Sequence, residues 1–425
     1  MNYSEAIAFI HGTNKFGRKL GLSNINYLLG LMDNPEKDLK VIHIAGTNGK
    51  GSTSAFISNI LIEAGYNVGL FSSPFLQIFN ERIRLNNKNI PNQTLADITA
   101  FVKDKIDEMV SSGKDHPTEF EIVTAIAFEY YKRENVDMVV LEVGMGGRLD
   151  STNVVNVPLC TVITPIAMDH IDYLGETIEE IAGEKAGIIK DGVSVVVHPQ
   201  EIKASEVIER ITKEKNAPLT IVDLSSIEIT KETLTETKFK YEGNIYSISL
   251  LGRHQTRNAS VAINVMKNLN DISDFSIDQK SIERGLKGTV WPGRMEILNK
   301  KPLIIIDGAH NTHGAKSLRD TIEHLLKGRK VIGVIGILAD KEVDEMLELV
   351  VPLFDEVIVT EPNSPRSMSY TELTSKVKKY NNHVLGYERI LEAVIEARSK
   401  VGKDDVVLVF GSLYMIGEVR SILTE

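Results

Sequence analysis

The residues with the clearest capacity for chemistry form a glycine-rich segment at 46–53, Gly-Thr-Asn-Gly-Lys-Gly-Ser-Thr. An apolar run at 41–44 precedes it, and a stretch of helical composition follows it. A glycine turn between a strand and a helix binds phosphate, because backbone N–H groups and the helix N-terminus attract an anion. Lys50 adds a full positive charge, and Ser52 or Thr53 offers a hydroxyl to magnesium. We therefore predict a phosphate-binding loop.

The spacing within this segment departs from the standard nucleotide-binding loop. The standard pattern has four residues between its first glycine and its Gly-Lys pair, and Ser or Thr directly after the lysine. Here only Thr47 and Asn48 intervene, and Gly51 follows Lys50. The prediction therefore depends on the strand before the loop and the helix after it.

A carboxylate and a histidine follow two further apolar runs. Glu142 ends the run 138–142, and three glycines follow within five residues, which leaves room for a ligand. His170 follows the run 161–164. Parallel strands direct their carboxyl ends to one edge of a sheet, so both side chains belong at the ligand-binding edge. Glu142 suits magnesium, with a surface ion pair as the alternative. His170 is an unusual magnesium ligand, because hard cations prefer oxygen.

Other polar residues carry weaker signals. Ser73 follows a strand and could reach the same edge, but Ser-Pro turns are common for structural reasons. Lys185 lies among small residues, and composition alone favours a solvated helical lysine there. In the second half of the chain, Asp307 could accept hydrogen bonds from a ribose and His310 could contact phosphate. Arg294 could reach a phosphate when two domains close.

The wider pattern predicts an α/β protein of two domains. With 425 residues the chain is too long for a single core. Short apolar runs alternate with amphipathic stretches, which is typical of βαβ units and a mostly parallel sheet. Residues 221–251 alternate around Gly243-Asn244 and favour a small β-hairpin region. We expect an N-terminal domain at 1–293 with a P-loop-type parallel sheet and this β subregion, and a C-terminal Rossmann-like domain at 294–425. The expected strands are 41–44, 68–71, 138–142, 161–164, 194–198, 303–307, 331–335, 357–360 and 406–410.

Composition excludes several partners. The net charge of -10 argues against non-specific nucleic-acid binding. Cys160 is the single cysteine, so an internal disulfide and a thiolate metal cluster are impossible. The first residues lack a secretory pattern, and no apolar run is long enough to span a bilayer. We expect a cytoplasmic protein without a membrane or nucleic-acid partner.

Taken together, these segments resemble the folylpolyglutamate synthases, including bifunctional dihydrofolate synthases, within the wider family of Mur-type ATP-dependent amide ligases. The resemblance covers nearly the whole chain in order, and it explains the shortened phosphate loop. The stretches Glu-Val-Gly-Met-Gly-Gly-Arg-Leu-Asp at 142–150 and Trp-Pro-Gly-Arg at 291–294 are the most specific. Further matching stretches are 72–74, 80–83, 118–121, 169–170, 184–190, 251–258 and 307–311.

The resemblance implies a set of ATP and metal ligands. ATP would be bound by Asn48, Gly49, Lys50, Gly51, Ser52, Thr53, Asn258, Arg294 and Asp307. Two magnesium ions would be held by Ser52, Ser73, Glu142, His170 and a carbamate formed from Lys185 and carbon dioxide. K+ is an additional candidate cofactor. The catalytic set would be Lys50, Lys185, Arg294 and His310, the last near the transferred phosphate.

The resemblance also implies the acceptor pocket. Thr118, Glu119, Phe120, Leu149 and Arg82 would lie near the pteroate group, with a loop at 20–28 covering it. That loop lacks the acidic-basic pair that the family often has after its leucine.

The implied reaction is ATP-dependent addition of L-glutamate to a folate carboxylate through an acyl phosphate, and the acceptor is a reduced folate, dihydropteroate or both. We expect a monomer. Two alternatives remain. Another Mur-type amino-acid ligase shares most of these features. A nucleotide-regulated switch would fit Asp172-Tyr173-Leu174-Gly175, but the chain has no Asn-Lys-x-Asp guanine motif.

Overall fold

The computed structural model describes residues 1–17, 21–272 and 274–424. Contacts divide the chain into two compact units, and each unit combines two stretches of sequence. The boundary expected at 293/294 leaves the small β region in the N-terminal domain, whereas the contacts group this region with the second unit. The first unit consists of Met1–Ser225 and Asn258–Gly288, and the second of Ser226–Arg257 and Thr289–Glu425.

The first unit is built on an eight-stranded sheet with the order β4-β3-β2-β5-β1-β6-β7-β8. The strands from β2 to β8 in this order are parallel, and β3 and β4 extend one edge in antiparallel fashion. The central strands are buried throughout and rich in Val, Ile and Leu, as expected for a parallel sheet covered on both faces. The strands are β1 (Val41–Ala45), β2 (Val68–Phe71), β3 (Ile83–Leu85), β4 (Lys88–Asn89), β5 (Met138–Glu142), β6 (Cys160–Ile163), β7 (Val195–Val197) and β8 (Leu219–Ile221).

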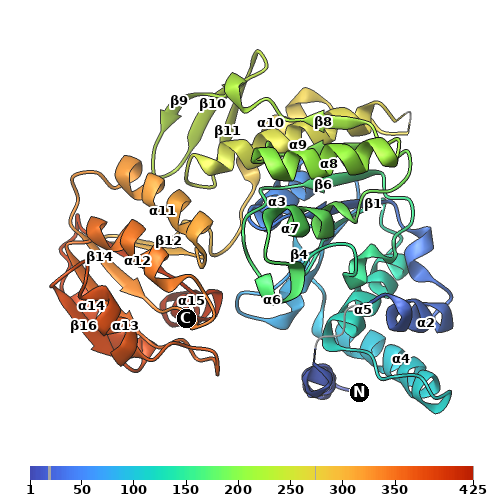
Figure 1. Ribbon diagram of the computed structural model, residues 1–425, viewed down its shortest axis with the longest axis horizontal. Helices are drawn as coiled ribbons and strands as arrows, with labels where there is room; N and C mark the ends of the chain where they lie inside the picture. The colour runs from blue at the N-terminus through green and yellow to red at the C-terminus, as the bar shows by residue number, and fades with distance from the viewer. Residues whose placement is uncertain (18–20, 273, 425) are drawn as a thin grey trace. The chain divides into compact units, whose positions relative to one another are not determined.

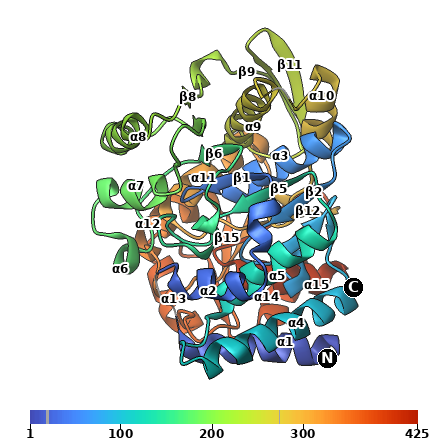
Figure 2. The same ribbon diagram turned by 90° about the vertical axis from the view of Figure 1, so that its right-hand side faces the viewer.

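Helices of the first unit cover this sheet. A large apolar cluster joins α2, α4 and α5 to β1, β2 and β5, and α1 lies beside α4 (Figure 2). A second cluster joins α7 and α8 to β6 and β7. Helices α7 and α8 lie side by side (Figure 1). Helix α3 is buried along most of its length and packs against α10. The helices are α1 (Tyr3–Gly12), α2 (Ser23–Leu31), α3 (Lys50–Glu63), α4 (Asn92–Ser111), α5 (Glu119–Arg133), α6 (Ile171–Leu174), α7 (Ile178–Ala186), α8 (Ile202–Glu214), α9 (His254–Asn270) and α10 (Gln279–Gly288).

The segment predicted as a loop at 20–28 is largely helical. Helix α2 begins at Ser23 and buries Ile25, Leu28 and Leu29, so this part of the prediction is wrong. The apolar residues at three- and four-residue spacing explain the helix. Leu20 lies outside the described residues.

The second unit contains a six-stranded sheet with the order β12-β13-β17-β14-β15-β16. All its strands are parallel except β12, which pairs with β13 in antiparallel fashion. Its strands are β12 (Glu296–Lys300), β13 (Leu303–Asp307), β14 (Val331–Ile335), β15 (Glu356–Thr360), β16 (Val384–Tyr387) and β17 (Val406–Phe410). Its helices, orange to red in Figure 1, are α11 (Thr312–Leu325), α12 (Val343–Val350), α13 (Tyr370–Val377), α14 (Ile390–Ser399) and α15 (Leu413–Thr424).

The predicted β region forms a three-stranded antiparallel sheet of β9 (Glu228–Glu232), β10 (Thr237–Tyr241) and β11 (Asn244–Ile248). Strands β10 and β11 are joined by Glu242 and Gly243, which both have positive φ. Two central residues with positive φ match the twist of a tight hairpin, which explains why the glycine marked this turn.

Among the described residues, no helix combines the length and the apolar composition that crossing a bilayer requires.

Candidate active site

Four predicted site segments follow neighbouring strands of the first sheet. Strand β1 pairs with β5 so that Ile44 lies opposite Glu142, and it pairs with β6 so that Ala45 lies opposite Ile163. Strand β2 lies beside β5 with Phe71 opposite Leu141. The segments that contain Ser73, Glu142, the phosphate loop and His170 therefore emerge at one edge, as the parallel pattern predicts.

The phosphate loop has a shape that only glycine allows at two positions. Gly46 and Gly49 have φ values of +150° and +82°. A Cβ on Gly46 would lie 1.9 Å from Thr164 Oγ1, and one on Gly49 would lie 2.8 Å from Asn258 Oδ1. The second contact brings together two predicted ATP ligands that are far apart in the sequence. Asn258 is buried, with 4% of its surface exposed.

The start of the loop is tied to the segment after β6. The backbone N–H groups of Thr47 and Asn48 donate to the Pro165 carbonyl at 2.8 and 3.2 Å. The Thr47 hydroxyl donates to the Ala167 carbonyl at 3.0 Å and accepts from the Ala167 N–H at 3.1 Å. Helix α3 begins at Lys50, so Gly51, Ser52 and Thr53 occupy its first turn, and the Thr53 N–H donates to the Gly49 carbonyl at 2.9 Å. The positive end of the helix dipole therefore lies at the loop and favours an anion there.

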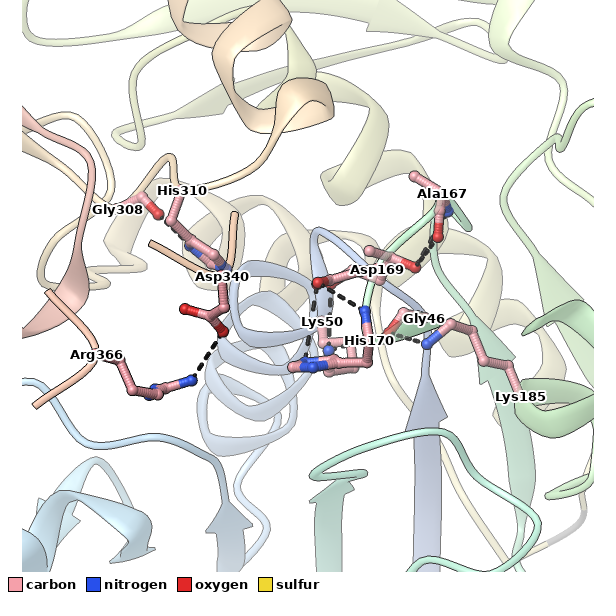
Figure 3. A network of polar contacts seen from close by, with 11 residues as sticks. Gly46, Lys50, Ala167, Asp169, His170, Lys185, Gly308, His310, Asp340 and Arg366 are labelled. Carbon is pink, nitrogen blue, oxygen red and sulfur yellow. Dashed lines mark hydrogen bonds and ion pairs between the residues drawn. The ribbon is translucent and has the colours of Figure 1, made fainter. Parts of the chain in front are cut away.

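Two ammonium groups converge on the carbonyl oxygen of Gly46 (Figure 3). Lys50 Nζ donates to it at 3.0 Å and Lys185 Nζ at 3.1 Å, and Lys50 also donates to the Thr47 carbonyl at 3.3 Å. Lys185 is only 4% exposed, so the solvated lysine favoured by composition is wrong. Burial, and then the charge of Lys50, lower the pKa of Lys185 to about 7, against the opposing charges of Asp169 and Asp150.

His170 lies at the N-terminus of α6 in the left-handed region, with φ of 54°. Its backbone N–H donates to Asp169 Oδ1 at 3.0 Å, and its Nε2 lies 3.9 Å from Asp169 Oδ2 (Figure 3). The imidazole is about one-third exposed, with a relative side-chain exposure of 35%. A ligand can therefore approach it from solvent.

The oxygen donors predicted for magnesium come from separate segments. Glu142 and Ser52 are buried, with 4% and 3% exposure, and Ser73 is half-buried. Within the described part of the chain, no three His, Cys, Asp or Glu side chains are grouped closely enough to hold a metal ion. Magnesium does not need such a group, because it commonly binds one or two carboxylates together with substrate phosphates and water.

The predicted acceptor residues surround the start of α5. Thr118 caps this helix: its N–H and hydroxyl both donate to Glu121 Oε2, at 2.7 and 2.8 Å. The Phe120 ring lies against Gly144, where an added Cβ would be 2.5 Å from Cζ, and it contacts Phe71 at a centroid distance of 5.9 Å. Phe120 therefore packs against the segment that follows β5. The Oε2 atom of Glu119 lies 3.3 Å from the Nδ1 atom of His11.

Arg82 and Leu149 complete the predicted acceptor set. The Arg82 guanidinium stacks over Phe75 and Phe79, at 5.2 and 5.7 Å from their ring centroids. Leu149 is half-buried in the segment after β5. An aromatic surface and an apolar side chain are suited to a flat heteroaromatic ligand.

In the second unit, three predicted residues meet at the end of β13. Asp307 accepts from the N–H groups of Met295 and Ala309, both at 2.9 Å. Burial raises the pKa of the Asp307 carboxyl, and the Arg294 charge opposes this shift. Arg294 lies so close to Gly308 that an added Cβ would meet its Nη1 at 1.8 Å.

His310 follows in the same loop. Its Nδ1 lies 2.7 Å from the Gly308 carbonyl, so Nδ1 carries the hydrogen and donates, because a carbonyl oxygen only accepts (Figure 3). Figure 3 also shows the ion pair between Asp340 and Arg366, with Oδ2 and Nη1 3.0 Å apart. Sequence reasoning did not single out this pair.

Sequence reasoning also missed two residues that shape the first unit's site. Asp150 is buried and accepts from Met145 N–H at 2.9 Å. Gln200, after β7, accepts from Ile166 N–H at 2.9 Å and donates to the Thr164 carbonyl at 3.1 Å. Asp150 ends the specific stretch 142–150 and was therefore detectable, whereas Gln200 lies outside every motif.

Comparison with known proteins assigns this architecture to a family. Residues 44–266 match the Mur ligase middle domain, and residues 293–413 match the Mur ligase glutamate ligase domain. The chain belongs to the Mur ligase family. The chain is 37% identical to the dihydrofolate synthase/folylpolyglutamate synthase of Bacillus subtilis over 99% of each chain. This similarity places it in the branch of folylpolyglutamate and dihydrofolate synthases.

Solved structures of this Mur ligase branch share the fold. A Mycobacterium tuberculosis folylpolyglutamate synthase complexed with ADP and AMPPCP is 30% identical, with a TM-score of 0.89 over 100% of this chain and 99% of that one. Escherichia coli FolC in complex with DHPP and ADP is 27% identical, with a TM-score of 0.88 over 100% and 98% of the two chains. The predicted family is confirmed, and so is the α/β class with a largely parallel sheet in each unit.

Proposed function

We propose that this chain is an ATP-dependent ligase that joins L-glutamate to a folate carboxylate through an acyl phosphate. The acceptor is a reduced folate, dihydropteroate or both. The central supporting observation is the edge of the first sheet, where Lys50 and Lys185 converge on one carbonyl beside the strand that ends in Glu142. Full-length similarity to folylpolyglutamate and dihydrofolate synthases supports the same assignment.

The chemistry answers a simple difficulty, which is that a carboxylate is a poor electrophile. A carboxylate oxygen attacks the γ-phosphorus of ATP, the bond to the β-phosphate oxygen breaks, and ADP leaves. The amine of glutamate then attacks the acyl carbon, a proton is lost from nitrogen, and phosphate leaves with the electron pair of the C–O bond. The first step needs alignment and neutralisation of charge rather than covalent catalysis by the protein.

The residues of the phosphate loop bind and orient ATP in this proposal. The N-terminus of α3, which begins at Lys50, favours phosphate through the helix dipole, and Lys50 exchanges its bonds to the loop carbonyls for phosphate oxygens. Asn258 supports the loop beside Gly49. Arg294 and Asp307 contact ATP from the second unit, and His310 lies near the transferred phosphate.

Magnesium is a proposed cofactor, with two ions per site, and when bound it neutralises phosphate charge. Glu142, Ser52 and Ser73 would supply oxygen ligands, and His170 a nitrogen ligand. The buried oxygens of Glu142 and Ser52 fit a hard cation. K+ is a further proposed ion, which a comparison of activity in K+ and Na+ tests.

Lys185 is proposed to become a carbamate. Its neutral nitrogen attacks carbon dioxide, a C–N bond forms, and one proton leaves, so that the side chain changes from cation to anionic oxygen ligand. A buried lysine with a pKa near 7 retains the neutral amine that this reaction requires at physiological pH.

The acceptor pocket is proposed at the start of α5, with Thr118, Glu119, Phe120, Leu149 and Arg82 near the pteroate group. We also propose a monomer that acts in the cytoplasm.

The direct test is ATP-dependent incorporation of labelled L-glutamate, with tetrahydrofolate and dihydropteroate supplied separately. The proposal expects a labelled folate product and one ADP per amide bond. If neither acceptor takes up glutamate, and a different amino acid is joined to a different acid instead, the chain is another Mur-type ligase.

A further inference from the structure

A buried chain of hydrogen bonds joins the strand before the phosphate loop to the segment after β5. His43 on β1 lies with Nε2 2.9 Å from Thr152 Oγ1, and that hydroxyl donates to Asp150 Oδ1 at 2.6 Å. His43 and Thr152 are completely buried, and Asp150 is 7% exposed. None of these three residues has a role in the reaction proposed above.

The direction of the bonds follows from the number of hydrogens. A threonine hydroxyl has one hydrogen, which Thr152 donates to Asp150, so His43 Nε2 must carry the hydrogen of the other bond. Burial raises the pKa of the Asp150 carboxyl, and the hydrogen bonds that it accepts from the N–H groups of Thr152 and Met145, at 3.0 and 2.9 Å, oppose this shift. Burial lowers the pKa of His43 to about 3, so its ring is neutral. The chain is thus directed from His43 to a buried carboxylate.

The carboxylate of Asp150 folds its own segment back on itself. Besides the Met145 N–H bond, the Asp150 N–H donates to the Gly147 carbonyl at 3.1 Å. The folded segment is fixed to α7, because Arg148 N–H donates to the Glu184 carbonyl at 2.7 Å. Any Cβ on Gly147 would lie 2.7 Å from that same Glu184 carbonyl, so the two backbones are in close contact.

Asn153 adds a second attachment to the same helix end. Its Nδ2 donates to the carbonyls of Arg148 and Gly187, at 3.0 and 3.1 Å. The next residue along α7 from Glu184 is Lys185, whose Nζ reaches the Gly46 carbonyl at 3.1 Å. Gly46 comes three residues after His43, so the contacts form a closed ring that starts and ends on β1 and its loop (Figure 3 shows the Lys185 end).

We propose that His43 and Thr152 are positioning residues, which hold the side chain of Lys185 at the phosphate loop through Asp150 and the segment 144–150. This inference rests on the proposed role of Lys185 as a carbamate. The closed ring of contacts sets the distance between Lys185 and Gly46. Its hydrogen bonds are shielded from water, and a buried donor or acceptor is costly to leave without a partner.

The test replaces Thr152 with valine, which has nearly the same shape and no hydroxyl, and with serine, which keeps the hydroxyl. Thr99→Val is the matched control, since Thr99 is also completely buried and its hydroxyl donates within α4 to Leu95. Three quantities are measured on each folded protein: hydrogen–deuterium exchange, kcat and KM for ATP, and the 13C resonance of a lysine carbamate after addition of 13C-bicarbonate.

We expect Thr152→Val to exchange faster at 144–150 and 178–187. Its kcat falls at least about fivefold, the factor for a hydrogen bond of about 1 kcal/mol, while KM for ATP changes less than about twofold. A higher bicarbonate concentration is needed to bring its carbamate resonance to full intensity. Thr152→Ser and Thr99→Val behave like the parent in all three measurements.

Unchanged exchange and kcat in Thr152→Val would overturn the positioning role. Equal losses in Thr99→Val would do the same, because general loss of stability would then explain the effect. Absence of the carbamate resonance in the parent is a different outcome. It contradicts the proposed chemistry of Lys185, and the proposed positioning role of His43 and Thr152 is then contradicted as well.

Discussion

At the scale of residues, the carbonyl oxygen of Gly46 is shared by the Nζ atoms of two lysines, whose charged forms repel each other. Lys50 and Lys185 approach it to 3.0 and 3.1 Å. The charge of Lys50 is one reason for the lowered pKa of Lys185. Binding a triphosphate would draw Lys50 away from the carbonyl, and a carbamate on Lys185 would replace repulsion by attraction. The proposed ligands thus relieve an electrostatic conflict in the free protein.

Lys50→Ala tests the phosphate contact. We expect kcat to fall about 100- to 1,000-fold, the usual effect of removing one preorganised charge, with little loss of stability because Lys50 is only partly buried. Steady-state ligation and thermal unfolding measure the two effects. Lys213→Ala, on the exposed face of α8, is the control. Near-normal ligation by Lys50→Ala would show that the loop assignment is wrong.

Lys185→Ala tests the carbamate. We expect loss of ligation, with partial recovery when a small carboxylic acid is added, because the acid supplies an oxygen ligand to the vacated space. The measurement is ligation rate against concentration of acetate or formate. An alanine variant as fast as the parent would rule out the role.

The same lysine predicts a pH dependence of stability in buffer free of carbon dioxide. Its pKa is about 7 in the folded protein and near 10.5 when unfolded. Between these values the unfolded chain binds more protons, so the free energy of unfolding rises with pH, by at most about 1.4 kcal/mol per unit. Urea unfolding from pH 7 to 9 should show a steeper rise in the parent than in Lys185→Ala, because the other titrating groups are common to both. Parallel curves would contradict the shift.

At the scale of elements, the site is assembled by strand ends and by the loops that lock them together. Gln200 illustrates this, since it follows β7 and fixes 164–166 after β6 through the bonds to Ile166 and Thr164. The Pro165 carbonyl in that segment accepts from Thr47 and Asn48 of the phosphate loop. The position of the loop therefore depends on a residue two strands away.

Gln200→Leu should raise KM for ATP about fivefold, because it removes bonds of about 1 kcal/mol that hold the segment under the loop. Nucleotide titration and ligation kinetics measure the change. Gln93→Leu, an exposed glutamine on α4, should leave both unaltered. If the two variants have the same KM, the segment after β6 does not position the loop.

The strands and the glycine loop were predictable because their signals are local. The apolar run ending at Glu142 and the glycines at 46 and 49 carry their structural meaning in a few adjacent residues. The contact of Gly49 with Asn258 and the burial of Lys185 were not predictable from composition, since both depend on packing between distant segments. Lys185 is buried because small residues beside it let α7 approach the segment 144–150 closely. An added Cβ on Gly187 would lie 2.3 Å from Arg148 Cβ.

At the scale of the whole molecule, the chain passes between its two compact units three times. The passages lie at 225/226, 257/258 and 288/289, and the second lies within the helix α9. The sequence boundary at 293/294 falls close to the third. Proposed ligands of ATP occur in both units.

The most direct test of the central claim follows oxygen through one turnover. The acceptor is supplied with 18O in the carboxylate that becomes the amide, together with ATP and L-glutamate. The account predicts one 18O atom in the released phosphate and unlabelled ADP, because the carboxylate oxygen leaves with phosphorus. Label in AMP, or phosphate free of 18O while amide forms, would contradict it.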